Sequence, residues 1–180
     1  LRGTPILYYG DEIGMHDVDI PPHLEQDPAG IRQPGQGRDP NRTPMQWSSA
    51  HLAGFSPTGT KNTWLPLADD YQEINVEKQL NRPGSMLNLY QQLIEIRKNH
   101  PALQSGSYRS ISDAPEGCYL YLRENDQERI LIGLNFGNQP CSINPDLVSG
   151  GKLLLKTNNR DELYSSLFTL EPNEGVLIQL

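Results

Sequence analysis

The most regular hydrophobic pattern in this chain of 180 residues alternates with a period of two and begins near residue 105. A polar stretch, 125–128, separates two strand-like segments, 118–124 and 129–136, which predicts a hairpin. The second segment places four apolar side chains on one face: Ile130, Ile132, Leu134 and Phe136. Turn residues separate further predicted strands at 152–156, 167–170 and 176–180. Short strands at this spacing predict a small antiparallel β-sandwich.

A helical pattern precedes these strands. Apolar residues of the segment from Ser85 to Asn99 recur at helical spacing on one broad face. Pro83-Gly84 interrupts the chain just before this segment, Ser85 is a favourable N-cap residue, and Pro101 ends the pattern. The sequence therefore predicts one helix over these residues.

The first 70 residues have little periodicity. The apolar run from Pro5 to Tyr9, closed by Gly10, predicts a strand buried on both faces, as in a parallel sheet. We expect its partner strands to belong to a part of the protein that precedes this sequence. Residues 15–70 are interrupted by prolines, but they contain aromatic residues that favour an ordered, functional loop over disorder: Trp47, Phe55 and Trp64.

Composition narrows the class of protein. The formal net charge is −7 and no basic run occurs, which argues against nucleic acid as a partner. No window approaches about 18 consecutive apolar residues, so no membrane-spanning segment is predicted. The four histidines show no HxH or HxxxH spacing, and nucleotide-binding motifs are missing from the sequence. We therefore expect neither a metal nor a cofactor.

Two cysteines, Cys118 and Cys141, are too few for a disulfide framework or a metal cluster. Both fall in apolar, strand-like segments, and we interpret them as two buried thiols rather than as a bridge. The lack of a disulfide framework favours a cytoplasmic protein.

Four charged residues could carry chemistry. Asp11 and Glu12 follow the strand directly, but adjacent strand residues point in opposite directions, so a capping or loop-anchoring role is favoured over an acid–base pair. Arg38 and Arg42 flank Pro40, which predicts a shaped loop. The planar fork of an arginine can bind sugar hydroxyls, or it can clamp the loop through an aspartate such as Asp39.

Two motifs resemble a known family. The string Gly3-Thr4-Pro5-Ile6-Leu7-Tyr8-Tyr9-Gly10-Asp11-Glu12-Ile13-Gly14-Met15 resembles the eighth barrel strand of the alpha-amylase superfamily. The string Gly37-Arg38-Asp39-Pro40-Asn41-Arg42-Thr43-Pro44-Met45-Gln46-Trp47 is similar to the signature of its alpha-glucosidase and oligo-1,6-glucosidase branch. Ala53-Gly54-Phe55, Trp64-Leu65-Pro66 and Ile74-Asn75-Val76 continue the resemblance.

The resemblance implies a fold in two parts. Residues 1–103 would form the C-terminal portion of a catalytic (β/α)8 TIM barrel, with strand 8, a long loop and helix 8. Residues 104–180 would form an antiparallel β domain. The resemblance also implies a retaining alpha-glucosidase that hydrolyses terminal alpha-linked glucose from oligosaccharides.

The same resemblance limits what this chain can do. The catalytic carboxylates of the family precede the segment that matches Gly3, so no catalytic residue is assigned here and the chain alone is predicted to be inactive. It would require the N-terminal remainder of the barrel, and an alpha-glucoside oligosaccharide would bind through the full-length protein. In this branch the arginine that matches Arg38 holds the terminal glucose, which predicts that Arg38 binds substrate and leaves Arg42 as a loop clamp. The family's calcium site lies in an early loop that has no counterpart here.

Three alternatives stay open. A trehalose synthase, an intramolecular glucosyl transferase, has similar motifs. A non-catalytic interaction module is also compatible, because some members of the superfamily are subunits of membrane transporters. Tyr108, Tyr119 and Tyr121 could form a sugar-binding platform on the β domain, although their alternation favours packing.

Overall fold

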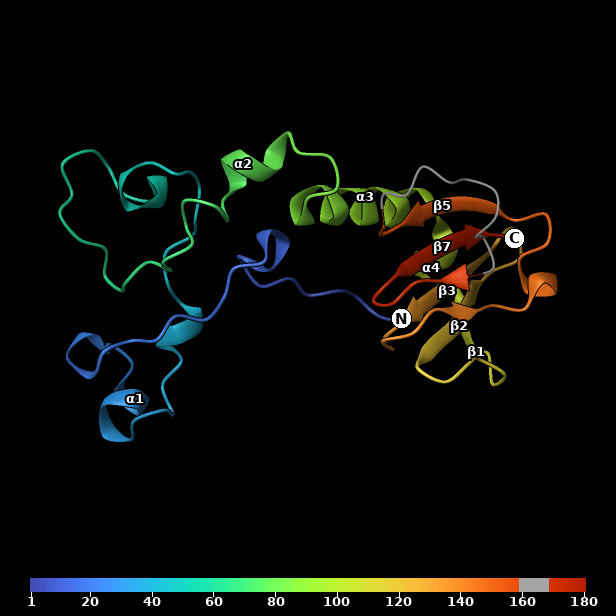
Figure 1. The fold of residues 1–180 in the computed structure, drawn as a ribbon, viewed down its shortest axis with the longest axis horizontal. Coiled ribbons are helices and arrows are strands. Elements are labelled where there is room, and N and C mark those ends of the chain that lie inside the picture. Colours follow the sequence, from blue (N-terminus) through green and yellow to red (C-terminus); the bar gives the residue numbers. More distant parts are fainter. Residues whose placement is uncertain (159–168) are drawn as a thin grey trace. The chain divides into compact units, whose positions relative to one another are not determined.

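A computed structural model describes residues 1–158 and 169–180 (Figure 1). The chain forms two compact units. One unit comprises Ile6–Tyr90, and the other joins Leu1–Pro5 to Gln91–Leu180. The predicted domain limits, 1–103 and 104–180, rest on the family resemblance and stay a prediction.

An antiparallel sheet of five strands dominates the unit that contains Gln91–Leu180, with the order β1-β2-β3-β7-β5. A second sheet pairs β4 with β6. The bounds are β1 Ser107–Ser110, β2 Cys118–Glu124, β3 Arg129–Asn135, β4 Cys141–Ser142, β5 Lys152–Lys156, β6 Thr169–Leu170 and β7 Gly175–Gln179. The register of β2 on β3 runs from Cys118 opposite Asn135 to Glu124 opposite Arg129, which confirms the predicted hairpin. The strand predicted at 167–170 is described from residue 169 only, since 167 and 168 lie outside the described residues.

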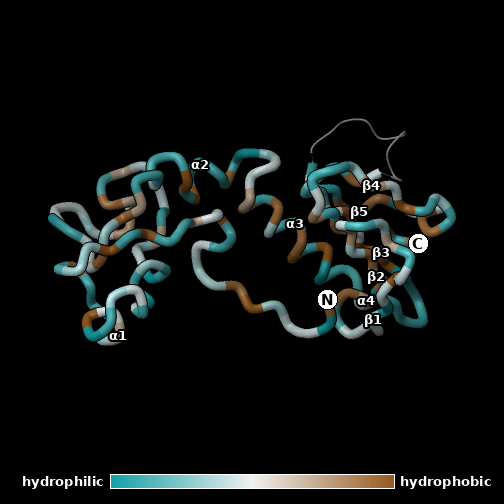
Figure 2. Tube along the Cα trace, turned by 60° about the horizontal axis from the view of Figure 1, so that its bottom comes forward, coloured by the Kyte–Doolittle hydropathy of each residue, from teal (hydrophilic) through white to brown (hydrophobic). Residues whose placement is uncertain are grey.

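Each face of the large sheet carries a buried hydrophobic cluster, although the residues of β1 are exposed. One face packs against the β4–β6 pair through a cluster that includes Leu131, Cys141 and Leu170, as a sandwich requires. On the other face, Ile130 and Ile132 pack with Leu103 and Tyr121. Ile130, Ile132 and Leu134 therefore share a buried face as predicted, whereas Phe136 lies beyond the end of β3 and is 72% exposed. Figure 2 shows the hydrophobic segments that run along these strands.

The predicted helix is α3, Met86–Asn99, and Ser85 caps it as expected, since its Oγ accepts a hydrogen bond from the Asn88 amide at 3.2 Å. A short helix, α4 (Pro101–Gln104), follows directly, because proline suits the first turn of a helix. Ile96 of α3 and Leu103 of α4 pack on the same face of the sheet as Ile130, which is the face opposite the β4–β6 pair. A single turn, Pro145–Leu147, precedes β5.

The unit Ile6–Tyr90 is built mainly from loops and single turns, as predicted for residues 15–70. Its α-helices are α1, Pro28–Arg32, and α2, Val76–Leu80, with 3-10 turns at Asp11–Ile13, Pro22–Leu24, Asp39–Asn41 and His51–Gly54. The strand predicted over Pro5–Tyr9 is absent from the structure, and Ile6 is 92% exposed. The apolar run is compatible with a strand of a sheet. A strand forms only where a neighbouring strand satisfies its backbone N–H and C=O groups. No described segment pairs with these residues.

The prediction of two free thiols is wrong, because Cys118 and Cys141 form a disulfide that joins β2 to β4. The two cysteines lie 23 positions apart on different sheets, and only the packing of those sheets brings the sulfur atoms together. The cytoplasmic prediction assumed reduced cysteines, so it loses that support and stays a prediction. Among the described helices, none is long and apolar enough to cross a membrane.

Candidate functional site

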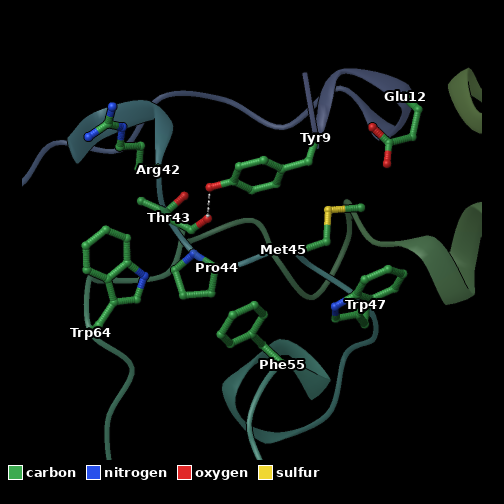
Figure 3. A pocket seen from close by; sticks show the side chains of 9 residues that line it. All are labelled: Tyr9, Glu12, Arg42, Thr43, Pro44, Met45, Trp47, Phe55 and Trp64. Atoms are coloured by element: carbon green, nitrogen blue, oxygen red, sulfur yellow. Dashed lines mark hydrogen bonds between the residues drawn. The ribbon is translucent and has the colours of Figure 1, made fainter. Parts of the chain in front are cut away.

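A cavity of about 340 Å³ opens in the unit Ile6–Tyr90 (Figure 3). This volume is at the lower end of the range for small-molecule sites. Its walls come from the turn after the apolar run, from the arginine-rich motif and from the loops that follow the motif. The lining residues are Tyr9, Glu12, Arg42, Thr43, Pro44, Met45, Trp47, Phe55 and Trp64.

The turn at Gly10 places Tyr9 against the motif. Gly10 has a φ of 94°, and a Cβ atom there would lie 2.8 Å from Met15 Sδ, so only glycine fits. The Tyr9 hydroxyl donates a hydrogen bond to the Thr43 carbonyl oxygen at 2.9 Å (Figure 3). Burial and the neighbouring Tyr8 raise the pKa of Tyr9, against an opposing effect of Arg42.

The motif lines the cavity from Arg42 to Trp47, except at Gln46. The Gln46 side chain is fully buried and donates to the Ile74 carbonyl oxygen, while the Gln46 carbonyl accepts from the Val76 amide at 3.0 Å. Met45 and Trp47, its two neighbours in the chain, both line the cavity (Figure 3). The motif is therefore anchored from one side and presents side chains from the other.

Aromatic rings form the exposed part of the wall. The exposed fractions are 50% for Trp47, 46% for Phe55 and 53% for Trp64. The Ala53 carbonyl accepts hydrogen bonds from the amides of Trp47 and Ser48, which fixes the loop beside Trp47. Leu52 and Ala53 have φ values of 52° and 54°, a left-handed conformation that costs free energy in residues with a Cβ. Strain of this kind persists only where surrounding contacts hold it.

Arg42 lines the cavity, whereas Arg38 does not. We expected the Arg42 side chain to clamp the loop, but it lies at the cavity wall instead. Its backbone amide donates to the Asp39 carbonyl oxygen at 2.9 Å, and in the described part of the chain its guanidinium makes neither a hydrogen bond nor an ion pair. A cationic donor thus belongs to the same cavity lining as the aromatic rings, a combination suited to a ligand with hydroxyl or anionic groups.

Arg38 makes the clamp instead. Its Nε donates to Asp27 Oδ2 at 2.7 Å and its Nη2 to Asp27 Oδ1 at 3.1 Å. The hydrogen bonds from the Arg38 side chain and from the amides of Ala29 and Arg38 hold the pKa of Asp27 well below its usual range. The internal clamp is therefore present, with Asp27 rather than Asp39 as the partner. Substrate binding by Arg38 stays a prediction.

Sequence reasoning missed Asp27. The available signal was the repeat of an Asp-Pro pair, Asp27-Pro28 and Asp39-Pro40, on both sides of a glycine-rich loop. In the structure Asp39 accepts hydrogen bonds from the amides of Gln26 and Asp27, at 2.6 Å and 2.8 Å. The two aspartates therefore tie the two ends of this loop to each other.

Asp11 and Glu12 anchor their own turn, as predicted. Asp11 Oδ2 accepts from the Tyr8 amide at 3.0 Å, and Glu12 Oε2 accepts from the Gly10 amide at 2.8 Å. Glu12 also reaches the cavity. Within the described ranges no group of three His, Cys, Asp or Glu side chains could hold a metal ion.

The three tyrosines of the β domain pack together. Tyr121 is buried, and its ring centroid lies 5.4 Å from those of Tyr108 and Tyr119. The hydroxyls of Tyr108 and Tyr119 bond to each other, and the Tyr121 hydroxyl accepts from the amino group of Leu1. These contacts confirm the packing interpretation.

Comparison with known proteins identifies a family. Residues 1–106 match the family model described as alpha amylase, catalytic domain. The chain is 36% identical to an oligo-1,6-glucosidase of Heyndrickxia coagulans over 203 residues, covering all of this chain and 35% of that protein. It is also 32% identical to the amino acid transporter heavy chain SLC3A1 of Mus musculus, covering 99% of this chain and 26% of that protein.

Similarity to solved structures supports the same family. A trehalulose synthase MutB variant in complex with Tris is similar with a TM-score of 0.82 and 27% identity, covering all of this chain and 36% of that one. The chain thus spans about a third of the length of the oligo-1,6-glucosidase that it matches. With these matches and its two motifs, the chain belongs to the alpha-amylase superfamily, in its alpha-glucosidase branch.

Proposed function

We propose that this chain is the C-terminal part of a retaining alpha-glucosidase and that Arg38 binds the terminal glucose of the substrate. The main support is that the Arg38 guanidinium is both held in place and exposed. Asp27 holds its Nε and Nη2 atoms, while the side chain is 61% exposed. Among the described residues its Nη1 atom has no acceptor, so one donor of a guanidinium that Asp27 holds is left for a ligand. Charged donors form strong hydrogen bonds with oxygen acceptors such as sugar hydroxyls.

The chain needs further structure to complete such a site. The run Ile6–Tyr9 exposes a series of apolar side chains, with 92% exposure at Ile6 and 50% at Leu7. Its backbone lacks sheet partners in the described part of the chain. We propose that the preceding part of a barrel covers this run and pairs with it, which would make it a barrel strand.

The chain by itself is proposed to be inactive. Retaining glycosidases place two carboxyl groups about 5–5.5 Å apart, across the scissile bond. Glu12, which lines the cavity, and its neighbour Asp11 are occupied by backbone amides of their own turn. The catalytic pair would therefore come from the preceding part of the enzyme.

The test compares Arg38→Ala with Arg32→Ala in the full-length enzyme, with a chromogenic alpha-glucoside as substrate. Loss of a charged hydrogen bond to substrate predicts a fall in kcat/KM of about 10- to 100-fold for Arg38→Ala. Arg32 is the matched control, because it is an exposed arginine of α1 that bonds to the Pro28 carbonyl oxygen. An Arg38→Ala enzyme as active as the control would refute the role of Arg38. The isolated chain should release no glucose, and turnover by it would refute the assignment of the catalytic pair.

A glucosyl transferase is the second candidate, supported by the similarity to trehalulose synthase. Product analysis separates the two. With maltose as substrate, the proposed hydrolase yields glucose and a transferase of the trehalose synthase type yields trehalose. With sucrose, the substrate in a solved trehalulose synthase complex, a transferase of that type yields trehalulose.

A further inference from the structure

We propose that Asp27 is a positioning residue for Arg38, which fixes the guanidinium with its Nη1 edge toward the terminal glucose. This inference rests on the proposed role of Arg38 in substrate binding. It adds that the geometry of the donor is set by a second residue, 11 positions earlier in the chain, that never touches the sugar.

The first support is that both carboxylate oxygens of Asp27 bond to Arg38. The Asp27 side chain is 1% exposed. Its Oδ2 atom accepts from Arg38 Nε at 2.7 Å and from the Arg38 amide at 2.9 Å, while Oδ1 accepts from Arg38 Nη2 and from the Ala29 amide, both at 3.1 Å. Asp27 therefore grips both the side chain and the backbone of Arg38. A guanidinium held by two parallel bonds cannot rotate freely about its last torsion angles.

The second support is that Asp27 is itself fixed by the residue next to Arg38. Asp39 is 2% exposed, and its Oδ2 atom accepts from the Asp27 amide at 2.8 Å. Residue 39 thus holds residue 27, and residue 27 holds residue 38. Because each end of the loop is hydrogen-bonded to the other, the guanidinium has little freedom to move.

The third support is the close approach of the backbones. A Cβ atom at Gly37 would lie 3.1 Å from the Gly30 Cα, and one at Gly30 would lie 3.2 Å from the Gly37 Cα. Real Cβ contacts are seldom that short, so both positions favour glycine. The loop is therefore built to bring the Asp27 end against the Arg38 end, as the ion pair requires.

A merely structural clamp would have the same contacts, so the test must separate the two roles. A structural clamp stabilises the unit Ile6–Tyr90, and its loss lowers the melting temperature without a specific effect on kcat/KM. A positioning residue acts through Arg38, so its effect on kcat/KM disappears once the Arg38 side chain is removed.

The experiment is a double-mutant cycle in the full-length enzyme with Asp27→Asn, Arg38→Ala and the double variant. We expect Asp27→Asn to lower kcat/KM about 10- to 100-fold through misplacement of the donor. We expect the double variant to be no worse than Arg38→Ala alone. The control is Glu73→Gln, which breaks an exposed ion pair with Lys78 of 2.7 Å in the same unit and should leave kcat/KM unchanged.

Two further variants cover the case in which Asp27→Asn fails to fold. Asp27→Glu keeps the charge but displaces the guanidinium, so it should fold and still lose kcat/KM. The charge swap Asp27→Arg with Arg38→Asp restores an ion pair without restoring the donor, so the melting temperature should recover while kcat/KM does not. Recovery of both would show that the pair is only structural.

A readout without activity completes the test. In the 15N-labelled full-length enzyme, the Arg38 Nε–H signal should exchange slowly with water, and Asp27→Asn should accelerate that exchange. The failures are distinguishable. Full activity of Arg38→Ala overturns the proposed function, and the inference falls with it. An impaired Arg38→Ala beside a fully active Asp27→Asn, or additive effects in the double variant, overturns only the inference.

Discussion

Arg123 of β2 donates a hydrogen bond to the carbonyl oxygen of Leu1 at 2.6 Å, across 122 positions of the chain. Its other donors reach the carbonyl oxygens of Ser107, Leu103 and Gly106 at 3.2, 3.2 and 2.9 Å. The side chain is 1% exposed. One buried guanidinium thus joins the first residue of the chain to the end of α4 and the start of β1.

Replacing this arginine should destabilise the unit that contains Gln91–Leu180. Arg123→Met fills a similar volume but leaves buried carbonyl groups without donors, at about 1–3 kcal/mol each. We expect a loss of at least about 3 kcal/mol in the free energy of unfolding, measured by urea titration with far-UV circular dichroism. Arg109→Met is the control, since this exposed arginine of β1 pairs with Glu124 of β2 and its loss should cost less than about 1 kcal/mol. Equal losses would contradict the role of Arg123.

Acid should weaken the same unit through Glu128. Partial burial raises the pKa of this carboxyl, but hydrogen bonds from the Ala102 amide and from His100, both at 2.8 Å, outweigh burial and lower it below its ordinary value of 4.5. A carboxyl with a lower pKa in the folded state contributes stability above its unfolded value and loses it as pH falls through the folded value.

The corresponding measurement is the urea midpoint between pH 7 and pH 3. Glu128→Gln should lower stability by about 1–2 kcal/mol at pH 7 and reduce the loss on acidification. Asp126→Asn, in the same turn, is the control and should keep the acid sensitivity of the unaltered chain. If Glu128→Gln keeps that sensitivity as well, another group controls it.

The disulfide should contribute measurably to the β domain. Cys118 and Cys141 close a loop across the two sheets, with a sequence separation of 23. For a loop of this length, reduction should lower the free energy of unfolding by about 2–4 kcal/mol. The measurement is urea unfolding with and without a reductant, and the variant with both cysteines replaced by alanine should not respond to the reductant. A reductant effect of equal size in that variant would exclude the bridge as its cause.

Asn75 should stabilise the unit Ile6–Tyr90. Its side chain is fully buried, accepts from the Lys78 amide at the start of α2 and donates to the carbonyl oxygens of Tyr71 and Gln72. Asn75→Ala should cost about 1–3 kcal/mol, because it removes a helix cap and leaves two carbonyls without donors.

Fluorescence measures this effect selectively, because Trp47 and Trp64, the two tryptophans of the chain, both belong to that unit. Asn75→Asp keeps the capping oxygen and loses the donors, so an intermediate loss is expected. Asn81→Ala, at the exposed end of α2, should be close to neutral. An Asn75→Ala chain with an unchanged fluorescence transition would contradict the prediction.

The candidate site could be foreseen only in part. The motif from Gly37 to Trp47 indicated a shaped loop, and Asp11 and Glu12 were predicted to anchor their turn, because these features depend on neighbours in the chain. Asp27 could not be identified as the partner of Arg38, since two aspartates, Asp27 and Asp39, were available. The aromatic wall likewise depends on how separate loops approach each other.

Local sequence patterns were sufficient to predict the hairpin of β2 and β3, the helix α3 with its Ser85 cap and the loop-rich nature of residues 15–70. Alternation, capping and proline content act over a few residues, so they can be recognised without knowledge of the fold. Tertiary contacts were needed to show that Cys118 pairs with Cys141, that Arg38 pairs with Asp27 and that Pro5–Tyr9 has no strand partner among the described residues. Each of these depends on whether a distant partner is present at bonding distance, and local periodicity carries no information on that.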